Sequence, residues 1–135
     1  MTMAITRNHR AARNQATINF ADAGAGPSAL QFRDAQGGLL LAVRALAKPC
    51  GTINATGEIV LQPAATNDLV LVTGKPVWCD WCNGDGVIIA GDVVTDEDGA
   101  GPFKIAGTSI GEDGHRTGMI YAGGVIVLDA PLVIG

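Results

Sequence analysis

The residues with the clearest chemical potential are three cysteines, two of which form a Cys-x-x-Cys motif at Cys79 and Cys82. A zinc site commonly needs four ligands, and only Cys50, His9 and His115 could join this pair. Redox chemistry of the thioredoxin type places such a pair at the start of a helix in a βαβ unit, a pattern that this sequence lacks. A strand would also put Cys79 and Cys82 on opposite faces, unless a bulge intervenes. We therefore interpret the cysteines as structural thiols, with metal binding and redox work as alternatives, and predict no cofactor.

An acidic run at residues 96–98 resembles a fragment of a calcium-binding loop. The EF-hand spacing needs oxygen ligands at its first, third and fifth positions, and Val94 stands where the first ligand is required. We therefore expect a solvated acidic turn and no metal site. A looser calcium site shared with Asp92, or with Glu112 and Asp113, is the alternative.

No nucleophile stands in a catalytic pattern. Ser28 and Ser109 lack a local motif, and Asp113 and His115 lie in a Gly-rich polar loop, which favours loop polarity over a catalytic dyad. The glycine-rich stretches do not follow a strand and open a helix with a lysine, so no phosphate-binding loop is indicated. We predict that the chain is not an enzyme.

The element that organises the sequence is residues 76–94, PVWCDWCNGDGVIIAGDVV. Two runs rich in β-branched and aromatic residues flank Asn-Gly-Asp-Gly at 83–86, and these four residues tolerate positive φ and permit a tight reversal. This pattern predicts a β-hairpin. Because a buried Trp pair covers a large apolar area, we expect Trp78 and Trp81 to form the centre of the core.

Short apolar runs separated by Gly-rich turns recur along the rest of the chain. Alternation in the run at 28–35 places Phe32 inward, and Phe103 faces inward from the run at 103–110. The run at 39–47 could be helical by propensity, but its flanking Gly-Gly and Lys-Pro favour a strand. The pattern predicts an all-β, single-domain antiparallel β-sandwich or small barrel, jelly-roll-like in character. Further strands are expected at 58–62, 68–73, 119–122 and 125–128.

Residues 1–19 read as an N-terminal arm, helical or extended, ahead of the β domain at 20–135. Thr6 could cap a short helix, which has almost no apolar face and would bury little against its own domain. The ionisable side chains before Asp22 are all basic, so the arm could dock onto an acidic copy or partner; a solvated terminal segment is the alternative. The docking candidates are Arg7, His9, Arg10 and Arg13.

Composition limits the classes of function. A chain of 135 residues suits one domain, and 16% of its residues are charged, against about 25% in a typical soluble domain. Low charge indicates a surface that assembles with a partner, with a mere Ala/Gly-rich composition as the alternative. The net charge of −4 argues against nucleic-acid binding. We expect no membrane insertion and no secretory signal, because no apolar run is long enough for either.

The order of these motifs resembles a family of small, uncharacterised proteins encoded among the virion-assembly genes of tailed phages and prophages. The shared layout begins with an arm rich in Arg, Asn and Ala, here ITRNHRAARNQA, and a strand near SALQFRDA. It continues with a leucine-rich strand, LLLAVRALAKPCGT, the W-x-x-W strand and turn VWCDWCNGDG, and AGDVV. The segment YAGGVIVLDAP closes it. The cysteines are no required part of this layout.

The resemblance implies a non-enzymatic structural component of a virion, in the tail or baseplate region, that assembles in the host cytoplasm. Its expected partners are other virion proteins, and the symmetry of tails implies a homo-oligomer, either a trimer or a hexamer. A capsid decoration protein is one alternative. A host-receptor or carbohydrate-binding module at a fibre tip, using loops 95–102 and 111–118, is the other.

Overall fold

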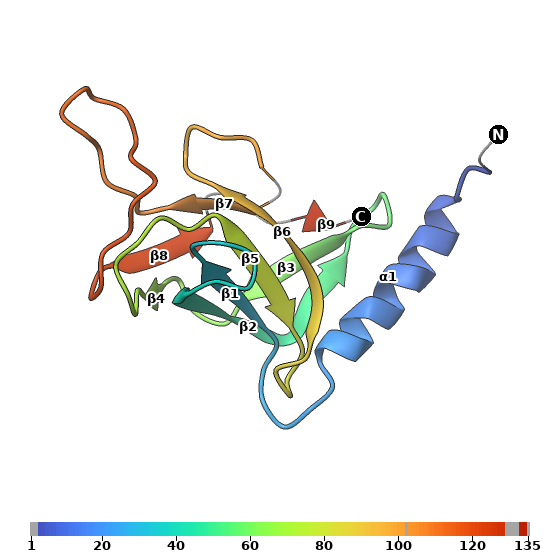
Figure 1. Ribbon diagram of the computed structural model, residues 1–135. Coiled ribbons are helices and arrows are strands. Elements are labelled where there is room, and N and C mark those ends of the chain that lie inside the picture. The colour runs from blue at the N-terminus through green and yellow to red at the C-terminus, as the bar shows by residue number, and fades with distance from the viewer. Residues whose placement is uncertain (1–2, 102, 129–132, 135) are drawn as a thin grey trace.

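The computed structural model describes residues 3–101, 103–128 and 133–134, which form one helix and nine strands (Figure 1). The helix stands outside the strands and leads into them from the N-terminus. The elements are α1 (Arg7–Ala21), β1 (Ala29–Arg33), β2 (Leu40–Ile53), β3 (Ile59–Pro63), β4 (Asp68–Leu69), β5 (Trp78–Cys82), β6 (Ile88–Thr95), β7 (Phe103–Ala106), β8 (Val125–Leu128) and β9 (Val133–Ile134).

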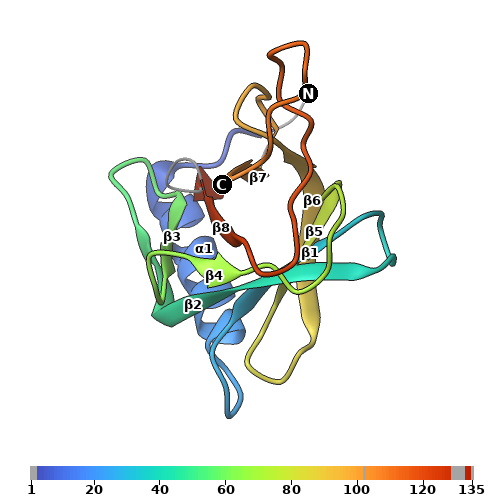
Figure 2. The same ribbon diagram turned by 90° about the vertical axis from the view of Figure 1, so that its left-hand side faces the viewer.

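All nine strands belong to one sheet, in the order β4-β8-β7-β6-β5-β1-β2-β3-β9. The sheet curls, so that Val70, just after β4, returns to Ala42 of β2 in an isolated antiparallel bridge (Figure 2). Neighbouring strands are antiparallel except β6 and β7, which pair in parallel from Val94 and Phe103. The prediction of a mostly β domain is confirmed, and the sheet is a curled mixed one.

The central hairpin forms where the sequence predicted it. β5 and β6 pair in antiparallel register from Trp78 opposite Val93 onward. The turn is closed by Asn83, whose Oδ1 accepts hydrogen bonds from the backbone N–H groups of Asp85 and Val87, at 2.9 and 3.0 Å. The Asn side chain thus supplies the partners that a tight reversal leaves unpaired.

The core lies on the inner face of the curled sheet. Trp81 is 1% exposed, and its Nε1 donates a 2.7 Å hydrogen bond to the Ser28 hydroxyl, which in turn donates to the backbone oxygen of Cys82. A buried indole N–H needs such a partner. Phe32 and Phe103 are also buried, so these three predicted core residues are confirmed. Aliphatic side chains around them include Leu30, Leu46, Ile59, Leu61, Ile105, Ile120 and Ile126.

The prediction that Trp78 shares this core is wrong. Trp78 is half-buried and does not belong to the core cluster. Side chains alternate along a strand, so residues three apart, such as Trp78 and Trp81, point to opposite faces of the sheet. Trp78 therefore lies on the outer face.

The N-terminal segment also departs from expectation. Thr6 caps α1 as predicted, accepting from the His9 N–H at 3.2 Å. The helix runs past residue 19 to Ala21, and Ile18 and Ala21 are buried in the core of the β domain. Buried residues that recur every three or four positions form a narrow stripe on one face of α1. This stripe is enough to pack the helix against the sheet. The helix therefore packs against its own domain, where the sequence predicted little burial.

Strand ends differ where local geometry interrupts the apolar pattern. β2 continues to Ile53, well beyond the predicted end, through a register shift between Leu46 and Gly51. The strand expected at 103–110 stops at Ala106, because Gly107 has a φ of 95°. The strand expected at 119–122 is reduced to a single bridge between residues 74 and 120. β9 was not predicted.

The buried Trp81 gives the first test. Trp81→Ala should lower the free energy of unfolding by about 3–5 kcal/mol, because it removes apolar contacts and leaves a cavity beside a Ser28 hydroxyl that has lost its indole donor. Urea denaturation followed by circular dichroism measures this change. Val87→Ala, in an exposed turn position, is the control and should change stability by less than about 0.5 kcal/mol. A loss under about 1 kcal/mol for Trp81→Ala would show that the hairpin is peripheral to the core.

Candidate functional site

The four basic docking candidates all lie on α1. Arg7 Nη1 donates to the Ala55 carbonyl at 2.8 Å, and Arg10 Nη1 donates to the Thr56 carbonyl at 3.0 Å. His9 is exposed, and Arg13 lines a hollow between α1 and β6. Both guanidinium bonds run to neutral oxygens in the β2–β3 turn. Docking of these side chains onto another molecule stays a prediction.

The β2–β3 turn is built to receive the helix. Asn14 is buried and donates its Nδ2 to the Gly57 carbonyl at 2.8 Å. Gly57 has a φ of 85°, and a Cβ there would lie 2.7 Å from the Arg7 carbonyl oxygen. Only glycine satisfies both the conformation and the close approach. Asn54 stabilises this turn, because its Oδ1 accepts hydrogen bonds from the N–H groups of Thr56 and Glu58.

A polar network occupies the outer face of the sheet, where no core residue lies. Strand register aligns Arg33 of β1 with Trp78 of β5, and Gln31 with Asp80. Trp78 Nε1 donates to Asp80 Oδ1 at 2.9 Å, and Arg33 Nε donates to Asp80 Oδ2 at 3.1 Å. Each carboxylate oxygen of Asp80 thus has a partner, as a buried charge requires.

Arg33 is fixed at its other nitrogens as well. Its Nη2 donates to Gln31 Oε1 at 2.7 Å, and its Nη1 donates to the Gly38 carbonyl at 3.0 Å. The side chains of Arg33 and Asp80 are 22% and 9% exposed, respectively. A Cβ at Gly91 would lie 3.0 Å from the Trp78 ring, so the indole lies close over β6. The result is a hydrogen-bonded Trp–Asp–Arg cluster on the face of the sheet opposite Trp81.

Apolar side chains border this cluster. Val93 lies opposite Trp78 in the register and is 45% exposed, and Leu39, next to Gly38, is 55% exposed. Trp and Arg are the residues most enriched at the energetic centres of protein interfaces, with apolar contacts around them. We define this surface, Arg33, Trp78, Asp80 and Val93, as the outer face. Its arrangement suits contact with another protein surface.

Sequence reasoning did not identify the outer face, because Arg33 and Asp80 lie 47 positions apart. The available signal was the alternation of Trp78 with Asp80, two residues apart on one strand. Side chains of a strand alternate between its two faces, so this spacing places Trp78 and Asp80 together on the face that Trp81 does not occupy.

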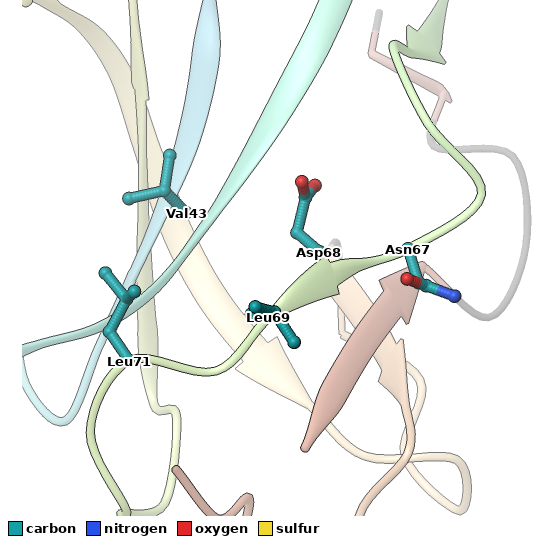
Figure 3. A pocket seen from close by; sticks show the side chains of 5 residues that line it. All are labelled: Val43, Asn67, Asp68, Leu69 and Leu71. Atoms are coloured by element: carbon teal, nitrogen blue, oxygen red, sulfur yellow. The ribbon is translucent and has the colours of Figure 1, made fainter. Parts of the chain in front are cut away.

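A shallow hollow of about 400 Å³ lies between β2 and the segment around β4 (Figure 3). It is lined by Val43, Asn67, Asp68, Leu69 and Leu71. The Asp68 carboxylate is already engaged, because its Oδ2 accepts from Arg44 Nη1 at 2.9 Å and from the Ala45 N–H. The hollow therefore offers mainly apolar contact.

Arg44 holds this region in place. Its side chain is 3% exposed, and Nη2 donates to the carbonyl oxygens of Ala65 and Thr66 at 2.8 and 2.9 Å. Its Nε is buried and has no hydrogen-bond partner in the part of the chain that the structure describes. Removing Asp68 would leave a buried guanidinium charge, so the pair specifies the path of the loop before β4.

The acidic run is partly structural. Glu97 Oε1 accepts from the N–H groups of Gly107 and Thr108 at 2.9 and 3.1 Å, and Oε2 accepts from the Thr108 hydroxyl. Burial alone would raise the pKa of Glu97, but these hydrogen bonds and the Arg116 charge outweigh it and lower the pKa below its ordinary value. The expected solvated acidic turn is therefore wrong for Glu97.

The remaining chemical candidates are not assembled into a site. Asp113 Oδ1 accepts from the backbone N–H of His115, which is turn geometry. Among residues 3–101, 103–128 and 133–134, no three His, Cys, Asp or Glu side chains come together as metal ligands. The same part of the chain contains no helix that is long and apolar enough to cross a membrane.

The cysteines are buried and unpaired. Cys79 belongs to the core cluster and Cys82 does not. A register shift between Trp81 and Cys82 interrupts strict alternation there, so the placement of the two thiols on opposite faces stays a prediction. Burial, and then the Asp22 charge, raise the pKa of Cys50 to about 12. Burial and the Asp80 charge raise the pKa of Cys79 and of Cys82 as well. A thiol is unreactive without its thiolate form.

This burial predicts slow thiol labelling. At pH 8 the native protein should react with a disulfide reagent such as DTNB far more slowly than the protein in 6 M guanidinium chloride, where all three thiols should react. Absorbance at the released thionitrobenzoate band follows the reaction. Rapid labelling of the native protein would show that at least one thiol is accessible and activated.

Glu97 predicts a pH-dependent stability. Its pKa is lower in the folded protein than its ordinary value of 4.5, so the carboxylate stabilises the fold above that pH. This stabilisation is lost as the pH falls through the lower, folded-state pKa. Glu97→Gln should cost about 1–3 kcal/mol at pH 7, by the typical worth of hydrogen bonds to a charged group.

The difference between Glu97→Gln and the wild type should shrink between pH 7 and pH 3, in thermal or urea denaturation. Glu112→Gln, at an exposed position, serves as the matched control. A difference that stays constant with pH would contradict the assigned ionised role of Glu97.

Comparison with protein-family models, with curated proteins and with solved structures found no match for this chain. Its function is therefore argued from its own residues: the outer face, the basic helix and the layout of its sequence motifs.

Proposed function

We propose that the protein is a non-enzymatic structural subunit of a tailed-phage virion, most directly of the tail or baseplate, that assembles in the host cytoplasm. The observation that carries this proposal is the outer face. A half-buried Trp78 donates a hydrogen bond to the buried Asp80, which also pairs with Arg33, and the exposed Val93 lies opposite Trp78 in the register.

The physical argument concerns pre-organisation. The Trp78 and Arg33 side chains are already fixed by hydrogen bonds, so little conformational entropy remains to be lost when a partner covers them. An aromatic and an Arg side chain at the centre of a patch, with apolar groups around them, match the composition of protein–protein interfaces. Their fixed geometry supports an assembly role for the domain.

The charge distribution supports the same proposal. The basic residues of α1 stand on a chain whose net charge is −4, and Arg7 and Arg10 bond neutral carbonyl groups of their own domain. Their positive charges can attract an acidic neighbour in an assembly. The motif order in the sequence indicates which assembly, a virion of a tailed phage.

We further propose that the curled sheet forms a small, open barrel. The bridge between Ala42 and Val70 supports this description over two stacked sheets, because it brings the β4 end of the sheet back to β2. A barrel of this kind presents its outer face to neighbours and leaves its interior as core.

The experiment is to purify particles from the phage or induced lysogen that encodes the chain and to quantify their proteins by peptide mass spectrometry. The protein should be present in a fixed copy number per particle. Its absence from purified particles would overturn the proposal. Copy number and labelling position distinguish a tail or baseplate part from a capsid decoration protein.

The outer face gives a matched pair of variants. Val93→Asp places a charge beside Trp78 at an exposed position and should reduce incorporation at least tenfold, because it would bury an unpaired charge in the contact. Ile110→Asp, at an exposed position outside the outer face, should be incorporated normally. Equal incorporation of both variants would show that the outer face is not the contact.

A further inference from the structure

One edge of the sheet is open along β6. Among the described residues, only Val94 and Thr95 of β6 pair with β7, so the first part of β6 has β5 as its sole neighbour. The Val94 N–H donates to the Val77 carbonyl, on the β5 side, at 2.9 Å. Backbone groups alternate in direction along an antiparallel strand, so the N–H and C=O of Gly91 point away from β5 toward the open edge.

Val93 also has no strand partner on this side among the described residues. Its N–H, which also points away from β5, is bonded by Oδ1 of the adjacent Asp92 at 2.7 Å. An edge strand with unpaired peptide groups is a template for another strand.

A hollow of about 570 Å³ lies beside this edge, between β6 and α1. Phe20 and Ile88 on its walls are 52% and 57% exposed, and Ile89 is half-buried. A helix on one side and a free strand edge on the other make a groove for an extended peptide. Main-chain hydrogen bonds would hold such a peptide, and alternate side chains would enter the hollow. The full lining is Arg13, Ala16, Thr17, Phe20, Ile88 and Ile89.

The chain carries a segment with the required pattern. Met3 and Ile5 precede α1, lie outside any helix or strand, and are 89% and 40% exposed. Being two residues apart, they would lie on one face of an extended strand. Thr6 is already extended, with φ −70° and ψ 159°.

We propose that residues 3–6 of a second copy of this chain add a strand to the open edge of β6, with Ile5 and Met3 entering the hollow beside Phe20 and Ile88. Four extended residues span about 13 Å, and the free length from Ile88 to Gly91 has the same number of residues.

The donor is a second copy because the tail of the same copy points elsewhere. Arg7 and Phe20 are separated by about 20 Å along the helix at 1.5 Å per residue, which exceeds the span of residues 3–6. Figure 1 shows the N-terminus at the end of α1 that lies far from β6. A tail on its own hollow would also have to reverse direction at Thr6, which is extended.

Charge complementarity favours the same occupant. Arg7 follows the donated segment directly and contributes a positive charge. Exposed carboxylates stand at both ends of the receiving edge, Asp85 in the hairpin turn and Asp92 after Gly91. A tail that binds along this edge therefore brings its arginine next to an acid, whichever way the strand runs.

The contact is head-to-tail, since the tail of one copy meets the edge of the next. Heterologous contacts of this kind close into rings or continue as filaments. This contact does not depend on the virion role, because it can be measured with the purified chain alone.

The test uses Ile5→Asp, which spoils the tail, and Ile88→Asp, which spoils the receiving edge. Both positions are exposed, so both variants should fold, as thermal denaturation by circular dichroism will verify. Multi-angle light scattering should show that the wild type assembles with rising concentration and that each variant alone stays monomeric up to at least tenfold higher concentration. Ile110→Asp is the matched control and should assemble like the wild type.

Mixing the two variants separates this contact from any other. One intact tail and one intact edge remain in the mixture, so it should form 1:1 dimers and nothing larger. A wild-type protein that is monomeric at every concentration would overturn the proposal. Assembly that survives Ile5→Asp or Ile88→Asp, or a mixture that forms no dimer, would overturn it equally.

Discussion

The buried hydrogen bond from the Trp81 indole to the Ser28 hydroxyl, 2.7 Å long, fixes how β1 and β5 meet. Ser28 passes the bond on to the Cys82 carbonyl, so one chain of polar contacts joins residues that are more than fifty positions apart in the sequence. An unmet indole N–H at this depth would cost about 1–3 kcal/mol, which gives the register a strong preference. With Trp81 held inward, Trp78 and Asp80 must point outward.

The outward side chains are then constrained in turn. Asp80 is almost buried although it lies on the outer face, and it needs both Arg33 and Trp78 to satisfy its charge. The same β5 register therefore determines the core and the surface that we propose to be an interface. α1 adds a second constraint, because its seat on the core through Ile18 leaves its far side facing the open edge of β6. Both candidate contacts arise from the way one strand and one helix are anchored.

Local patterns in the sequence predicted the elements whose cause is local. The hairpin at 83–86 follows from residues that tolerate a tight reversal, and the Thr6 cap follows from the side chain itself. The large apolar area of Trp78 favours a core position, but strand alternation places its side chain on the face opposite to that of Trp81. The helix was misjudged because a stripe of Ile18 and Ala21 is too short to show as an apolar face, while its remaining contacts are polar bonds to a distant turn.

Features that depend on long-range pairing could not be read from the sequence. The Arg33–Asp80 pair, the Arg44–Asp68 pair and the parallel pairing of β6 with β7 all join segments whose proximity follows only from the completed sheet. The length of β7 also depends on a contact between separate segments. The N–H groups that follow this strand donate to Glu97, so they are not available for further strand pairing. These interactions decide where the surface is polar, apolar or open.

The most direct test of the account is hydrogen exchange at the Gly91 amide, measured by NMR at several protein concentrations. This N–H points away from β5, so it should exchange quickly in dilute solution and become protected as copies assemble, with protection absent in Ile5→Asp. Exchange at Gly91 that is equally fast at all concentrations would contradict a donated strand. Protection already complete in the dilute monomer would contradict the open edge itself.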